Sequence, residues 1–130
     1  MMTKEEHINH WLKTSENDLK TMNILFKEGS YTHSLFFGHL YLEKVCKALW
    51  VKHSNENIAP YTHNLTRLLE GIETDLSEDD LDFLVELNDY QLEGRYPEFT
   101  ERLYKKTTKE ITERYISKIK MIDECLRRKL

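Results

Sequence analysis

One segment of this chain, residues 31–53, carries apolar side chains on almost every side of a helix. Its apolar positions are Leu35, Phe36, Phe37, Leu40, Tyr41, Leu42, Val45, Cys46, Leu49, Trp50 and Val51. A helix that is apolar all round is usually the buried centre of a helical packing. The other elements must then surround this helix, which constrains the fold more than any other feature.

Four further helices are predicted from capping signals and apolar spacing. Thr3 and Glu6 form a capping box that begins a helix over Lys4–Lys27. Ser77 and the acidic residues that follow it begin a helix over Glu78–Gln91, because negative charge is favourable at a helix N-terminus. The other two are a short helix over His63–Glu70, capped by Thr62, and a final helix over Thr108–Lys129, begun by Thr107 with Glu110.

This pattern predicts an all-α fold, an antiparallel up-and-down bundle of four to five helices in one domain spanning residues 1–130. The chain holds only 4 Gly and 2 Pro, which favours helices over a sheet sandwich. It has no apolar run long enough to cross a bilayer and no signal-peptide core, so no membrane association is expected. The two cysteines lack CxxC spacing, which is typical of a cytoplasmic protein with free thiols.

Charge is unevenly spread along the chain. The net charge is −4, so the protein is not a nucleic-acid binder by bulk charge. Residues 68–98 contain 11 acidic residues and one basic residue, whereas residues 99–130 contain 10 basic and 5 acidic residues. The C-terminal part could therefore present a local positive face.

A narrow polar stripe interrupts the apolar helix. His39, Glu43 and Lys47 are spaced four residues apart and so share one side of it. Glu43 and Lys47 have the favourable order for an ion pair, and a purely structural role explains the stripe. The functional alternative is a polar groove facing a ligand or partner. No second pair in the order His-x-x-x-Glu exists, so neither a metal nor another cofactor is predicted.

Two further polar positions allow the same pair of interpretations. His63 and Asn64 open the short third helix, either as structural contacts or as polar groups at an anion-favouring helix end. Arg95 and Tyr96 precede Pro97, which is expected to end the fourth helix. Arg95 is then fixed in a position to bind either a phosphate or an internal carboxylate such as that of Glu43.

Three stretches together resemble the HEPN domain family. They are "FFGHLYLEKVCKALWVKH", "PYTHNLTRLLEGI" and "LNDYQLEGRYPEF", and they cover about Leu35–Glu98 in the family's order. The resemblance implies a bundle of four or five helices that is often dimeric. It also implies a protein encoded beside a minimal nucleotidyltransferase as a toxin–antitoxin pair. Many such proteins are RNA-cleaving toxins, and others bind nucleotides.

The sequence departs from the catalytic members of that family. Those members carry an arginine followed about four to six residues later by a histidine, which supplies acid–base catalysis. No histidine follows Arg95, and none occurs anywhere after His63. The resemblance therefore supports the fold and the partner more than it supports an enzyme.

Three functions remain open. The first is a HEPN-like partner of a minimal nucleotidyltransferase that binds a nucleotide or RNA phosphate in one polar groove. The predicted lining of this groove is His39, Glu43, Lys47, His63, Asn64, Arg95 and Tyr96. The second is an RNA-cleaving toxin with a relocated histidine, and the third is a structural dimeric scaffold. A homodimer is expected in each case, because the central helix has more apolar surface than the other helices of one small bundle can cover. Phe36, Phe37 and Trp50 are the candidates for this excess.

Overall fold

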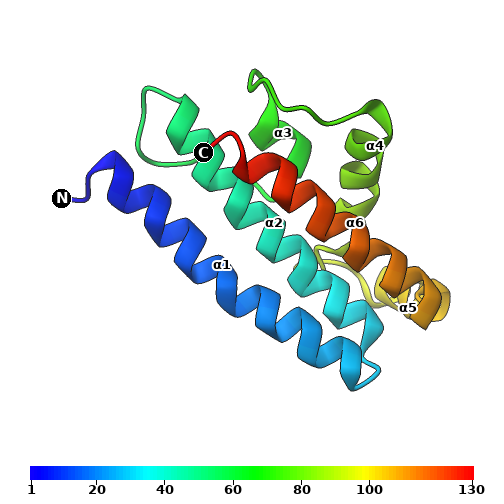
Figure 1. The fold of residues 1–130 in the computed structure, drawn as a ribbon. Helices are drawn as coiled ribbons and strands as arrows, with labels where there is room; N and C mark the ends of the chain where they lie inside the picture. Colours follow the sequence, from blue (N-terminus) through cyan, green and yellow to red (C-terminus); the bar gives the residue numbers. More distant parts are fainter.

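The computed structural model describes residues 1–130 and consists of six α-helices and one short 3-10 helix, with no strand (Figure 1). This confirms the all-α bundle predicted from the sequence. The elements in chain order are α1 (Lys4–Lys27), α2 (Tyr31–His53), α3 (Leu65–Leu69), α4 (Glu78–Leu87), η1 (Asn88–Tyr90), α5 (Pro97–Lys106) and α6 (Lys109–Arg127).

The central helix is α2, as its apolar composition predicts. It contacts α1, α3, η1, α5 and α6, and Figure 1 shows it between α1 and α6. Six of its eleven apolar positions have no exposed surface: Leu35, Leu42, Val45, Cys46, Leu49 and Val51. Burial in this apolar centre raises the pKa of the Cys46 thiol well above its usual range.

The helices do not alternate in direction throughout the bundle. Helices α1 and α2 are antiparallel and joined by a tight turn at Gly29, where φ is +81°. Helix α6 instead runs along α2 in the same direction, because α3, α4 and α5 are inserted between them. Hydrogen bonds of Tyr41 with Asp123, and of His53 with the carbonyl of Lys129, fix this alignment.

Because Gly38 has no side chain, α1 and α6 can pack closely against α2 at this position. A Cβ atom at this position would lie 2.7 Å from Ile119 Cδ1 and 3.1 Å from Met22 Sδ. Further along, the Tyr41 hydroxyl donates to Asp123 at 2.6 Å, and Arg127 binds the same carboxylate. Burial, together with Asp123, raises the pKa of Tyr41 to about 12, so this hydroxyl stays a donor at neutral pH.

Several predicted helix ends are corrected by the structure. The short third helix is capped by Asn64 rather than Thr62, because the Asn64 side chain accepts from the backbone N–H of Arg67 at 3.4 Å. The fourth helix ends at Leu87, since the chain tightens there into a 3-10 turn. The cap of α6 is Thr108, whose hydroxyl accepts from the N–H of Ile111, and not Thr107.

Helix α5 was not predicted, and the expected role of Pro97 was wrong. Pro97 does not end the fourth helix but begins α5, where its missing N–H costs nothing and its fixed φ is favourable. Gly94, with φ of +75°, turns the chain before this start. Because α5 carries Phe99 and Arg102, this helix determines the surroundings of Arg95.

None of the helices combines the length and apolar character that spanning a membrane requires.

Candidate functional site

The polar stripe of α2 forms a buried ion-pair cluster. Lys47 Nζ donates to Glu43 Oε2 at 3.0 Å, and His63 Nδ1 donates to Glu43 Oε1 at 2.8 Å. The side chains of Glu43 and Lys47 are 6% and 9% exposed. Lys47 Nζ also lies 5.1 Å from the centre of the Trp11 ring. One carboxylate therefore compensates the buried ammonium and fixes the orientation of His63, which is 36% exposed.

His39 is the most deeply buried member of the stripe. Its side chain has no exposed surface, and its Nε2–H donates to Asn88 Oδ1 at 3.1 Å. Its Nδ1 makes no hydrogen bond and lies 3.8 Å from Glu43 Oε1. Burial lowers the pKa of His39, an effect opposed by the charge of Glu43 and the hydrogen bond to Asn88. The neutral ring therefore acts as a structural donor to Asn88.

Asn88 connects this cluster to its neighbours, although the sequence analysis did not single it out. Its Oδ1 also accepts from the backbone N–H of Leu65 at 3.2 Å, and its amide donates to Asn64 Oδ1 at 3.1 Å. Asn64 thus caps α3 and at the same time binds Asn88. The available signal was its place in "LNDYQLEGRYPEF", one of the three stretches on which the family resemblance rests.

Arg95 lies outside the buried cluster. Its Nε donates to the carbonyl of Gln91 at 3.0 Å, and its Nη2 donates to the carbonyl of Asn88 at 3.3 Å. Its guanidinium carbon lies 4.4 Å from the centre of the Phe99 ring. The ion pair with Glu43 that the sequence allowed is absent, because that carboxylate is bound by Lys47 and His63.

A surface hollow surrounds Arg95 at the start of α5. Its volume is about 430 Å³, and its lining is Gly94, Arg95, Tyr96, Glu98, Phe99 and Arg102. Tyr96 is 80% exposed, and the guanidinium carbon of Arg102 lies 6.0 Å from the Phe99 ring centre. A second hollow of about 290 Å³ continues along α5 and shares Phe99 and Arg102. We call these two adjoining hollows the α5 groove.

The seven predicted groove residues are thus divided between two places. His39, Glu43, Lys47, His63 and Asn64 lie in one network, whereas Arg95 and Tyr96 belong to the α5 groove. Asn88 joins the two places, because its side chain binds His39 and its carbonyl accepts from Arg95. Phe99 and Arg102 were missed, because the sequence pattern predicted no helix in this part of the chain.

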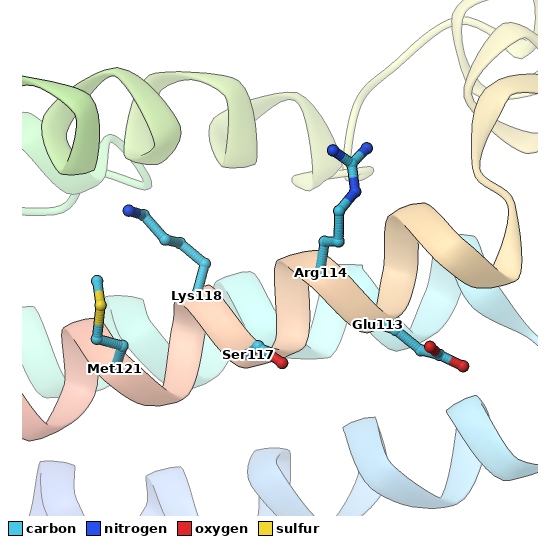
Figure 2. Close-up of a pocket in the computed structure, with 5 residues that line it drawn as sticks. All are labelled: Glu113, Arg114, Ser117, Lys118 and Met121. Carbon is cyan, nitrogen blue, oxygen red and sulfur yellow. The ribbon is translucent and has the colours of Figure 1, made fainter.

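A third hollow lies on the outer face of α6, as Figure 2 shows. It has a volume of about 450 Å³ and is lined by Glu113, Arg114, Ser117, Lys118 and Met121. Lys118 is already bound to Asp80 on α4 at 2.6 Å, and this contact lowers the pKa of the Asp80 carboxyl. All lining residues come from one helix, so no second element directs polar groups into it. No group of three or more His, Cys, Asp or Glu side chains has the arrangement of a metal site.

Comparisons with known proteins agree with this architecture. The structure is similar to the crystal structure of TT1696 from Thermus thermophilus, with a TM-score of 0.77 and 19% sequence identity. That match covers 95% of this chain and 98% of the other, and at this identity it shows the fold alone. A search of curated proteins finds no significant match. The family model described as the HEPN domain matches residues 8–129, so the chain belongs to the HEPN domain family.

Proposed function

We propose that this HEPN domain is a binding module that holds a phosphate of a nucleotide or RNA in the α5 groove. The observation that carries the proposal is the pair of guanidinium groups, of Arg95 and Arg102, beside the Phe99 ring in one surface hollow. Arginine forks match phosphate oxygens, and exposed aromatic faces stack on bases. Tyr96 provides such a face at the rim.

The position of Arg95 supports this role. Two carbonyls fix its Nε and Nη2, while its Nη1 makes no hydrogen bond within the chain. Less side-chain entropy is then lost when a ligand binds. The buried cluster of His39, Glu43 and Lys47 supports Asn88, and Asn88 in turn accepts from Arg95. In this proposal those stripe residues position the groove, and His63 and Asn64 remain the members nearest to solvent.

A binding titration tests the proposal with labelled ATP and a labelled single-stranded RNA as probes. Arg102→Ala is the cleaner variant, because the Arg95 side chain also binds backbone carbonyls, whereas the Arg102 side chain forms no ion pair or hydrogen bond within the chain. Loss of a charge-assisted contact should weaken binding about tenfold. Arg128→Ala, at the C-terminal end of α6, is the matched control and should bind like the wild type. Equal affinity of all three proteins would refute the proposal.

The proposed cytoplasmic partner is a minimal nucleotidyltransferase, as in other toxin–antitoxin pairs of this kind. The proposal predicts that the gene beside this one encodes such an enzyme and that the two proteins copurify when coexpressed. A neighbouring gene of unrelated function would favour a structural scaffold instead.

The RNA-cleaving alternative requires a histidine and Arg95 to act on one phosphate, and no contact in the structure joins them directly. RNA incubated with the protein should therefore stay intact, and cleavage that His63→Ala abolishes would favour the toxin.

A homodimer is part of the same proposal. Phe36, Phe37 and Trp50 are only partly buried on the central helix, as an apolar interface requires. Light scattering at micromolar concentration should give twice the chain mass of 15.7 kDa. A monomer mass across that range would contradict the dimer.

A further inference from the structure

A separate hollow with an apolar floor lies between α3 and α4. Its volume is about 320 Å³, and its lining is Thr66, Leu69, Glu70, Ile72, Thr74, Leu81, Asp82 and Val85. Val85 is 55% exposed although it lies on a helix that packs its opposite face into the core. An apolar hollow open to solvent is a common feature of protein docking surfaces.

The surroundings of this hollow are strongly acidic. Residues 66–86 contain eight acidic side chains and one basic side chain. Only two of the eight form ion pairs, Asp80 with Lys118 and Asp75 with Lys129. Glu70 and Asp82 line the hollow without an ion-pair partner. The negative potential of this face is therefore not balanced within the chain.

We infer that this α3–α4 hollow docks a basic amphipathic segment of a partner protein. An aliphatic side chain of that segment enters the hollow beside Ile72 and Val85, while lysines or arginines on either side meet Glu70 and Asp82. Nucleic acid and anionic membrane surfaces carry the wrong charge for this face. The inference does not depend on the proposed phosphate site, which lies on α5 and carries the opposite charge.

A peptide titration tests the inference on the full chain. The probe is a labelled amphipathic peptide of Leu and Lys at helical spacing, and a scrambled peptide of the same composition controls for charge alone. Asp82→Lys should weaken binding of the amphipathic peptide about fivefold or more. Val85→Ser should weaken it about threefold, because it removes apolar contact. The matched controls are Glu124→Lys and Met121→Ser, which change exposed residues of the same types on α6.

The outcomes of this titration distinguish between the possible occupants of the α3–α4 hollow. The inference is supported if the amphipathic peptide binds more tightly than its scrambled form, and if its binding is weakened in the two α4 variants but not in the two α6 variants. Equal binding of both peptides, or equal loss in all four variants, overturns it in favour of unspecific charge attraction. A self-association that Asp82→Lys abolishes and the peptide does not compete with would identify a second copy of the chain as the occupant and also overturn it.

Discussion

Replacing Glu43 by Gln should destabilise the protein far more than replacing an exposed glutamate. The substitution removes the only carboxylate that compensates Lys47, whose side chain is 9% exposed and whose remaining neighbour is the Trp11 ring at 5.1 Å. Breaking a buried pair by removing one partner typically costs about 3–5 kcal/mol. Gln keeps a carbonyl oxygen that can still accept from Lys47, so we expect a loss of about 3 kcal/mol in the free energy of unfolding.

Urea unfolding followed by circular dichroism measures this loss. Glu101→Gln is a matched control, because Glu101 pairs with Lys105 at the same spacing of four residues on an exposed surface. It should change the free energy of unfolding by less than about 0.5 kcal/mol. The double variant Glu43→Gln with Lys47→Met removes both charges and should recover much of the loss. A loss below about 1 kcal/mol for Glu43→Gln alone would refute the argument that this carboxylate compensates a buried charge.

Three further predictions concern α2 and use the same unfolding measurement. Leu42→Ala should cost about 2–5 kcal/mol, because Leu42 is fully buried at the centre of the bundle, and a smaller cost would place it outside the core. Gly38→Ala should cost about 1–3 kcal/mol through the clash with Ile119 and Met22, and a gain in stability would show that these side chains move aside. Burial lowers the pKa of His39 in the folded state from 6.5, so the unfolded chain takes up this proton first as the pH falls. Stability should therefore decrease below about pH 6.5 by up to about 1.4 kcal/mol per pH unit. This component should be missing in His39→Gln, and identical pH profiles would contradict it.

The buried half of the candidate site was largely predictable. Helical spacing alone places His39, Glu43 and Lys47 on one side of α2, and the favourable order of Glu43 and Lys47 predicts the ion pair that the structure contains. The bounds of α1 and α2 were also correct, because capping residues and long apolar patterns determine them. Such local signals do not depend on the rest of the fold.

The surface half of the site was not predictable in the same way. Pro97 was interpreted as a helix end, although proline is equally suited to the first turn of a helix, and the missed helix carries Phe99 and Arg102. The partners of Arg95 are backbone carbonyls of Asn88 and Gln91, and side-chain patterns give no signal for these. A carboxylate was the natural candidate for its partner, but tertiary packing binds Glu43 to other residues.

The salt dependence of RNA binding tests the phosphate-binding role of the α5 groove most directly. Each phosphate contact to a single strand contributes about 0.7 to the slope of log affinity against log salt concentration. If Arg102 meets a phosphate, Arg102→Ala should lower this slope for a labelled single-stranded RNA by about 0.7, while Arg128→Ala keeps the wild-type slope. An unchanged slope in Arg102→Ala, or no measurable RNA binding by the wild type at low salt, would contradict a phosphate site in this groove.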